Sequence, residues 1–313
     1  MSIKPGISDL RWMAAGAVVL LIFMLVLLRL RKDQDPAVAL AFKAQRADSV
    51  GRMQLDLASA AEAEKSAVLA TTDQDSQTFA DEARAASGKV EQERRELGDL
   101  LTAGGTAGER ELLAQFSAAF VEFQRIDADL LALAVKNTNI KAYNLAFGPA
   151  ATALEEENAA LARLATAHVD ASEARTMMPL AFGAQISSLR IQTLLPPHIA
   201  EESDEKMDRM EARMTAEDTQ VRTDLDGLAA LARFSQDPDL AIARARYAEF
   251  SNLKTQILAL SRENTNVRSL SISLNRKRKV MLACQAALND LQQAILAEPI
   301  AGTTYGAPAV RPR

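Results

Sequence analysis

The sequence has few of the residues that most metal and catalytic sites use. Its 313 residues include one cysteine, Cys284, and two histidines. A lone cysteine excludes an intrachain disulfide and a cysteine-based metal site. His168 has no acidic or cysteine neighbour at ligand spacing, so a zinc or histidine-based catalytic site is not expected. We therefore predict no catalytic residue, no metal and no cofactor, and we do not expect an enzyme.

The chain is also short of aromatic residues and of turn formers. Aromatics make up 4% of the sequence, and there are only 13 glycines and 10 prolines. The long stretches of Ala, Leu, Glu, Arg and Gln are good helix formers. Any core must then be built from thin layers of Leu, Ala, Met and Val, as in helix bundles. These features predict an all-α protein that is long enough for two modest cores.

One group of side chains matches the ligand types of a copper or haem site. His198 precedes Met207, Met210 and Met214, and imidazole and thioether ligands suit both groups. The methionines are spaced three and four residues apart, however, which is the spacing of a buried helix face. We interpret them as core residues, with His198 at a helix junction.

Neither sign of charge dominates the sequence. The 36 basic and 41 acidic residues give a net charge of −5, and they alternate along the predicted helices without the basic stripe that phosphate binding needs. Nucleic acid is therefore not an expected partner. One basic run is a solvated helix face or a docking patch for an anionic ligand, a lipid or an acidic partner: Arg276, Lys277, Arg278 and Lys279.

A long apolar run stands near the N-terminus. From Trp12 to Leu30 the only charged residue is Arg29, and nineteen residues at about 1.5 Å each roughly match the ~30 Å hydrocarbon core of a bilayer. We predict an N-terminal transmembrane helix, with residues 1–35 forming a tail and a single-span membrane anchor. A cleaved signal peptide is the alternative, because Ala37-Val38-Ala39 is similar to a small-residue cleavage site.

The opposite end of the chain is rich in proline and glycine and has no periodic pattern. Residues 298–313 are therefore predicted to form a disordered C-terminal tail. The basic residues that flank the apolar run place the large domain in the cytoplasm by the positive-inside rule. Lys4 and Arg11 precede the run, and more basic residues follow it: Arg29, Arg31, Lys32, Lys43 and Arg46.

The chain contains an internal repeat. Asn137-Thr138-Asn139 recurs as Asn264-Thr265-Asn266, at an offset of 264 − 137 = 127. The residues that follow keep their character in both copies: Ile140 and Val267, Lys141 and Arg268, Tyr143 and Leu270, Phe147 and Leu274. A period of this length is that of a domain and not of a solenoid. We therefore predict two tandem antiparallel four-helix bundles, at 36–170 and 171–297. They are joined by a kink or reversal at Pro179, and the alternative is a turn at Asp33-Gln34-Asp35-Pro36 that keeps the first bundle away from the membrane.

The repeated tripeptide is unusual inside a predicted helix. Asn and Thr side chains compete for backbone hydrogen bonds, so their presence has a local cost. One interpretation is a buried polar layer in which the Asn side chains fix register by satisfying one another. The other is a pocket for a small anionic ligand, with a cation one turn away. Its residues would be Asn137, Asn139, Lys141, Asn264, Asn266 and Arg268.

Two stretches, AEAEKSAVLATTDQDSQTFADEARAAS and ALSRENTNVRSLSISLNRKRKVMLACQAALNDLQQAI, carry a family resemblance. Each resembles part of the four-helix-bundle sensor domain of methyl-accepting chemotaxis proteins and their receptor-kinase relatives, over 13–170 and again over 171–297. The resemblance implies a sensory, signal-transducing homodimer with coiled-coil-like packing. It also implies the bacterial inner membrane, with the soluble domain in the periplasm, against the positive-flank count.

The chain departs from that family after its last predicted helix. It has no second span, no HAMP unit and no heptad-rich signalling hairpin, so the resemblance implies a sensor without its own transmitter. Such a protein would bind a separate receptor, kinase or envelope protein. The alternative is a structural, membrane-tethered helical scaffold or assembly subunit that has no ligand.

Overall fold

The computed structural model describes residues 36–300. The predicted membrane anchor within residues 1–35 and most of the predicted tail lie outside the described residues. Within the described part, no helix is both long and apolar enough to cross a membrane.

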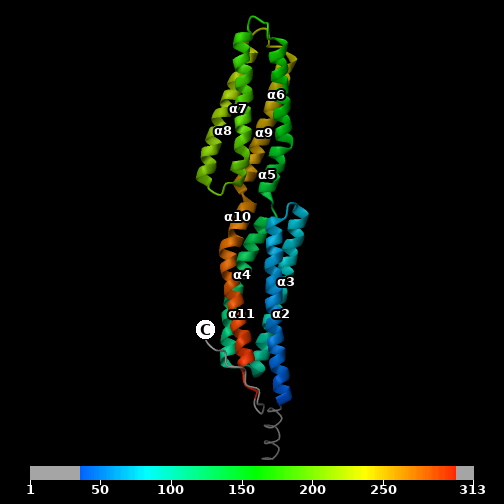
Figure 1. Cartoon of the computed structure of the whole chain (residues 1–313), viewed down its shortest axis with the longest axis vertical. Helices are drawn as coiled ribbons and strands as arrows, with labels where there is room; N and C mark the ends of the chain where they lie inside the picture. The colour runs from blue at the N-terminus through cyan, green and yellow to red at the C-terminus, as the bar shows by residue number, and fades with distance from the viewer. Residues whose placement is uncertain (1–35, 301–313) are drawn as a thin grey trace, which may run out of the picture. The chain divides into compact units, whose positions relative to one another are not determined.

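The prediction of an all-α protein is confirmed, since every element between residues 36 and 300 is helical (Figure 1). The elements are α2 (Pro36–Leu69), α3 (Asp73–Gly104), α4 (Ala107–Ala134), α5 (Thr138–Phe147), α6 (Pro149–Ala167), α7 (Ala174–Ala200), α8 (Asp204–Ala230), α9 (Pro238–Glu263), α10 (Thr265–Ile272), the π-helix η1 (Ser273–Lys277) and α11 (Arg278–Ala297).

The contacts divide the described chain into two compact units, which are considered separately. Unit 1 contains residues 36–60, 85–122 and 280–300, and unit 2 contains residues 61–84 and 123–279. This division does not follow the predicted boundary between residues 170 and 171. The reason is that α5 and α6, assigned by the repeat to a bundle at 36–170, pack instead against α7 and α9.

Unit 1 consists of four helical segments joined by polar contacts. Lys43 Nζ on α2 donates to the Leu296 carbonyl on α11 at 2.7 Å. Arg52 Nε donates to Glu93 on α3 at 2.7 Å, and Arg94 Nη1 of α3 donates to the Ser117 hydroxyl of α4 at 3.3 Å. The residues buried in this unit include the lone cysteine: Val50, Met53, Leu57, Val90, Leu97, Leu101, Phe116, Phe120, Cys284, Leu288 and Leu291.

Unit 2 contains the antiparallel helices α6, α7, α8 and α9, which lie side by side (Figure 1). Their shared core is mostly Ala, Leu, Ile and Met with few aromatics, as the composition predicted; its aromatic members are Phe234, Tyr247 and Phe250. A smaller cluster in the same unit joins the ends of α2, α3 and α4 with Ile272 of α10. The second half of the chain therefore contributes α10 to the helices of the first half.

Several helix starts follow the expected capping chemistry. The Thr72 hydroxyl accepts from the Asp75 amide at 3.0 Å, and Ser203 accepts from the Lys206 amide at 3.4 Å. Asp237 Oδ1 accepts from the Asp239 amide at 2.9 Å, with Pro238 at the first position of α9. These side chains satisfy amide groups that have no partner inside the helix.

The reversal predicted at Pro179 occurs earlier in the chain. Helix α6 ends at Ala167 and α7 begins at Ala174, so the turn occupies residues 168–173 and Pro179 lies inside α7. The Gln185 side chain donates to the Asn158 carbonyl at 2.9 Å, which shows that α7 folds back along α6. Pro179 is tolerated because it lies in the second turn of α7, near the helix start, where it removes one hydrogen bond.

Candidate functional site

The two Asn-Thr-Asn segments are helix breaks and not parts of continuous helices. Asn137 separates α4 from α5 and has φ 51° and ψ 37°. Asn264 separates α9 from α10 and has φ 53° and ψ 39°. Asn adopts this left-handed conformation more readily than most non-glycine residues. The expectation of an uninterrupted helix was therefore wrong at both copies, because the first Asn of each copy turns the chain.

The two copies of the repeat lie against each other and cap each other's helices. The Thr138 amide donates to the Thr265 hydroxyl at 3.2 Å, and the Thr265 amide donates to the Thr138 hydroxyl at 3.1 Å. The amides of Asn139 and Asn266 likewise donate to each other's side-chain oxygens, at 3.2 and 3.1 Å. The first amides of α5 and α10 thus find their acceptors in the other copy. We call the six residues 137–139 and 264–266 the junction.

The junction amides also bond to each other and to two helix turns. Asn139 Nδ2 donates to Asn264 Oδ1 at 2.8 Å, and Asn266 Nδ2 donates to Asn137 Oδ1 at 3.0 Å. Asn137 Nδ2 reaches the Ser76 hydroxyl at 2.9 Å, near the start of α3. Asn264 Nδ2 reaches the Glu201 carbonyl at 2.7 Å, at the start of the α7–α8 turn. The structure therefore brings together all four predicted Asn residues in one polar layer.

The two predicted ligand cations lie beside the junction and contact acidic groups. Lys141 Nζ is 2.9 Å from Asp73 Oδ2 and donates to the Lys136 carbonyl at 2.8 Å. The hydrogen bond from Lys141 is the main cause that lowers the pKa of the Asp73 carboxyl. Arg268 is 3.9 Å from Asp204 and about half exposed. Both cations have exposed side chains, whereas Asn137, Asn139 and Asn264 are buried.

An open groove of about 300 Å³ lies over the junction. Corresponding residues of the two copies line it: Asn139, Ile140 and Tyr143 from α5, and Asn266, Val267 and Leu270 from α10. The ends of α2 and α7 complete it with Val68, Leu69, Ala70, Ile199 and Ala200. The groove is therefore mainly apolar, with two amide side chains among its lining residues.

The four residues of the predicted basic docking patch do not share one exposed surface. Arg276, Arg278 and Lys279 are exposed, but Lys277 is 2% exposed and its ammonium group forms an ion pair with Asp127. The same ammonium group lies 3.4 Å from the centre of the Phe123 ring. The π-helix η1 ends at Lys277. Sequence reasoning missed this ion pair because 150 residues separate the two partners.

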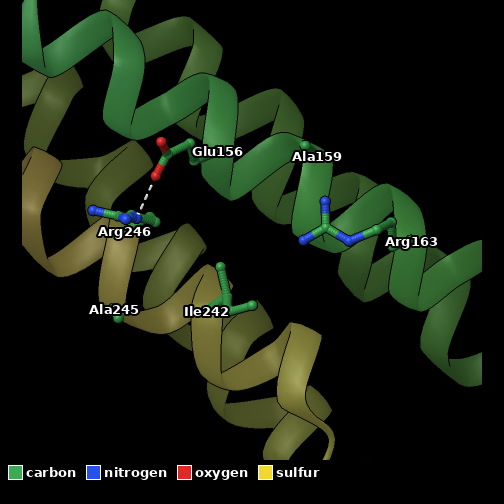
Figure 2. Close-up of a pocket in the computed structure, with 6 residues that line it drawn as sticks. All are labelled: Glu156, Ala159, Arg163, Ile242, Ala245 and Arg246. Atoms are coloured by element: carbon green, nitrogen blue, oxygen red, sulfur yellow. Dashed lines mark ion pairs between the residues drawn. The ribbon is translucent and has the colours of Figure 1, made fainter.

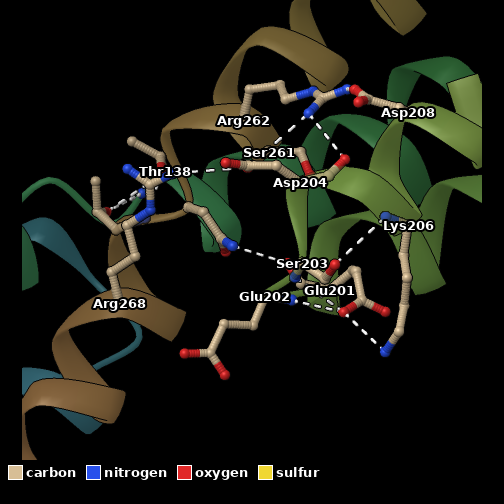
Figure 3. A network of polar contacts seen from close by, with 12 residues as sticks. Thr138, Glu201, Glu202, Ser203, Asp204, Lys206, Asp208, Ser261, Arg262 and Arg268 are labelled. Carbon is tan, nitrogen blue, oxygen red and sulfur yellow. Dashed lines mark hydrogen bonds and ion pairs between the residues drawn. The ribbon is translucent and has the colours of Figure 1, made fainter.

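His198 is buried in a polar network that continues along α8 and α9. Its Nδ1 is 2.8 Å from the Ser261 hydroxyl, and its Nε2 is 2.8 Å from Glu211 Oε1. Arg262 Nε donates to the same Glu211 oxygen at 2.6 Å. Figure 3 shows the Arg262 guanidinium next to Asp208 and Asp204. Burial lowers the pKa of His198, which favours the neutral imidazole.

Ser261, His198 and Glu211 are hydrogen-bonded in the order of a nucleophilic triad. Unlike a triad nucleophile, however, the serine is buried. Ser261 and His198 are both 0% exposed, and the Ser261 hydroxyl donates to the His198 carbonyl at 3.1 Å. A triad nucleophile must reach a substrate. In this conformation the network joins the end of α7 to α8 and α9, and the interpretation of His198 as a core residue agrees with its burial.

A second pocket, of about 360 Å³, lies between α6 and α9 (Figure 2). Glu156 of α6 pairs with Arg246 at 2.5 Å, and Arg163 of α6 pairs with Asp239 at 2.8 Å. Ala159, Ile242 and Ala245 are also lining residues. Each arginine is paired with a carboxylate of the facing helix, so the pocket has balanced charge.

Glu157 is a buried carboxyl group within the helices of unit 2. It is 0% exposed, and neither of its side-chain oxygens has a hydrogen-bond partner. Burial raises the pKa of Glu157 to about 8, and the nearby Ser188 hydroxyl donates to the Gln185 carbonyl instead. The group is therefore mostly protonated at neutral pH in the folded protein.

Comparison with known proteins finds no matching family model, no similar curated protein and no similar solved structure. Among the described residues there is also no cluster of three or more His, Cys, Asp or Glu side chains arranged to hold a metal ion. The candidate site therefore rests on the geometry of the junction and its groove.

We predict that Thr138→Val and Thr265→Val destabilise the protein non-additively. Each change removes a cap acceptor and should cost roughly 1 to 2 kcal/mol. The double variant should lose less stability than the two single variants added together, because either single change already removes the 3.2 Å contact between the two hydroxyls. Denaturant unfolding of the full chain, with the wild type, both single variants and the double variant, measures this double-mutant cycle. Thr219→Val, on the exposed face of α8, is the control and should change stability by less than about 0.5 kcal/mol.

We also predict that stability falls as pH rises through the range in which Glu157 is ionised only in the unfolded chain. The pKa of this carboxyl is about 8 in the folded protein, against an ordinary value of 4.5. Between these two pH values the unfolded state binds fewer protons than the folded state. Ionisation of Glu157 therefore lowers the free energy of unfolding by up to about 5 kcal/mol at pH 8. Glu157→Gln should flatten this dependence in pH-dependent unfolding measurements. Glu155→Gln, exposed on the same helix, should retain it.

Proposed function

We propose that this chain is a membrane-anchored, chemoreceptor-like helical sensor or partner-binding protein. The observation that carries the proposal is the junction, where the N-termini of α5 and α10 are capped only by each other's side chains. A ligand that shifts one of these helices must disturb the caps of the other. Such a shared contact is what a signal between two groups of helices requires.

The groove gives this junction an accessible binding surface. Its volume of about 300 Å³ is at the lower end of the range for small-molecule sites. Lys141 and Arg268 lie on the helices that form its two sides, and their exposed positions favour a small anionic effector. The ligand would then contact both copies of the repeat at once. In this proposal the exposed Arg276, Arg278 and Lys279 serve a separate receptor, kinase or envelope protein.

The scaffold alternative also has an observation in its favour. The Asn side chains of the junction bond to each other and to neighbouring turns, so the polar layer is satisfied without a ligand. A buried, fully satisfied layer is a device for fixing register. In that case the repeat would align the helices and the groove would remain unused.

A ligand-dependent thermal-shift measurement on the full chain separates the two functions. We expect at least one small carboxylate or amino acid to raise the melting temperature, because a ligand that binds only the folded state stabilises it by an amount that grows with the ratio of its concentration to its Kd. The effect should weaken in Leu270→Ala, which alters the lining of the groove, and in Lys141→Gln, which removes a cation beside it. Leu274→Ala removes an exposed leucine one turn along that does not line the groove, and it should keep the effect. No stabilisation by any compound of these classes would favour the scaffold.

The side of the membrane is a separate part of the proposal. We place the helical domain in the periplasm of a bacterial cell, with the apolar run from Trp12 to Leu30 as a single span of the inner membrane. A reporter that is active only in the periplasm, fused after Ala297, should be active. A silent reporter, together with an active cytoplasmic reporter at the same position, would put the domain on the other side, as the flanking basic residues indicate.

A further inference from the structure

Helices α6, α7, α8 and α9 of unit 2 form two pairs. Helix α6 packs mainly against α9, and α7 packs mainly against α8. An ion pair of Arg163 and Asp239 at 2.8 Å joins α6 to α9. Another, of Arg190 and Glu217 at 3.4 Å, joins α7 to α8. The two pairs meet along two sides, where α6 contacts α7 and where α8 contacts α9.

The α8–α9 side is held by charged groups. Asp218 of α8 accepts from Lys254 Nζ at 2.8 Å and from the Tyr247 hydroxyl at 2.7 Å, both on α9. Arg244 of α9 pairs with Asp226 of α8 at 2.9 Å. Exposed carboxylates titrate at about pH 4, and Lys and Arg titrate above about pH 10. These ion pairs therefore persist across the neutral range.

The α6–α7 side lacks such contacts. Helix α7 has no acidic residue, and within the described residues no ion pair joins it to α6. Gln185 of α7 donates to the Asn158 carbonyl of α6 at 2.9 Å. The side-chain oxygen of Asn158 and both oxygens of the adjacent Glu157 are buried without a hydrogen-bond partner in the protein. This side of unit 2 therefore has buried acceptors and too few donors.

The groups that face Glu157 cannot balance a negative charge. On α7 the neighbouring Ser188 is uncharged, and its hydroxyl donates to a carbonyl of its own helix at 3.1 Å. On α9 the facing titratable group is Tyr247, whose hydroxyl donates to α8. Arg246 of α9 is paired with Glu156, which is exposed on α6. A carboxylate at position 157 would thus be buried without a cation.

We propose that the α6–α7 side of unit 2 opens together with loss of the Glu157 proton, while the α8–α9 side keeps the two pairs joined. A buried carboxylate without a donor is costly, and separation of α6 from α7 lets water reach it. In the closed form burial raises the pKa of Glu157 to about 8, against an ordinary value of 4.5. The open form therefore releases the proton first, and a rise in pH between these values favours opening.

The opening would also displace part of the junction groove. Ile199 and Ala200 at the end of α7 line the groove opposite α5, which directly precedes α6. Separation of α6 from α7 would move these two parts of the lining apart, so pH would regulate the binding of a ligand. This last step rests on the proposed function. The opening itself does not, and it is measured without a ligand.

Thiol labelling of the full chain tests the opening. In a Cys284→Ala background, Ser188→Cys places a thiol at a position that is 0% exposed and near Glu157. Its labelling rate, relative to that of the unfolded chain at the same pH, should rise about a hundredfold from about pH 5.5 to about pH 7.5 and level off above about pH 8. Glu157→Leu and Glu157→Gln should each abolish this rise. Glu155→Gln, exposed on the same helix, should retain it.

Flexible thiol cross-linkers applied first at low pH locate the opening. A cross-link between Glu155→Cys and Leu189→Cys, both exposed, holds α6 to α7 and should suppress the labelling of residue 188. A cross-link between Thr219→Cys and Ala248→Cys, exposed on α8 and α9, should leave the labelling unchanged. Equal suppression by both cross-links would identify general unfolding and overturn the proposal. A labelling rate that does not depend on pH, or a dependence that survives in Glu157→Leu, would also overturn it.

Discussion

The reciprocal capping of α5 and α10 is the interaction on which the arrangement of unit 2 depends. Both helices begin inside the protein, where their first amides are out of reach of bulk water and need acceptors. The acceptors are the Thr and Asn side chains of the other copy, so neither segment completes its hydrogen bonding alone. This requirement explains why the chain contains the segment twice: each copy is the cap of the other.

The buried polar groups of this fold are of two kinds: the junction side chains have hydrogen-bond partners, and some buried carboxyl oxygens have none. Each junction Asn is bonded to several partners, so its burial is offset by hydrogen bonds that a low-dielectric environment strengthens. Glu157 and Asp224, by contrast, have buried oxygens without partners, and burial raises the pKa of both. Asp224 lies where a side chain on Gly183 would be, which shows how closely α7 and α8 approach. The buried amides of the junction are therefore satisfied by hydrogen bonds, whereas these carboxyls reduce stability when ionised.

The kinds of structure in this fold could be predicted from the sequence, but the way in which the helices are connected and packed could not. Helix content, the repeat and a polar layer made by the four Asn residues all follow from local patterns. The turn at Asn137 and Asn264 did not, because Asn in an apolar-periodic stretch is compatible with both a helix interior and a left-handed break. The exchange of α5 and α10 between the two halves has no local signal either. It depends on pairing across 127 residues, as the ion pair of Asp127 and Lys277 depends on pairing across 150.

The repeat also preserves residues that take no part in capping, and this bears on what the junction is for. Ile140 and Val267 are apolar in both copies and line the same groove, as do Tyr143 and Leu270. Capping alone needs only the Thr and Asn side chains, so it gives no reason for apolar residues at these accessible positions. Tyr143 differs from Leu270 in having a hydroxyl group, which donates to the Pro196 carbonyl of α7 at 3.4 Å. One side of the groove is therefore hydrogen-bonded to α7, whereas Leu270 on the other side has no hydroxyl group to form such a bond.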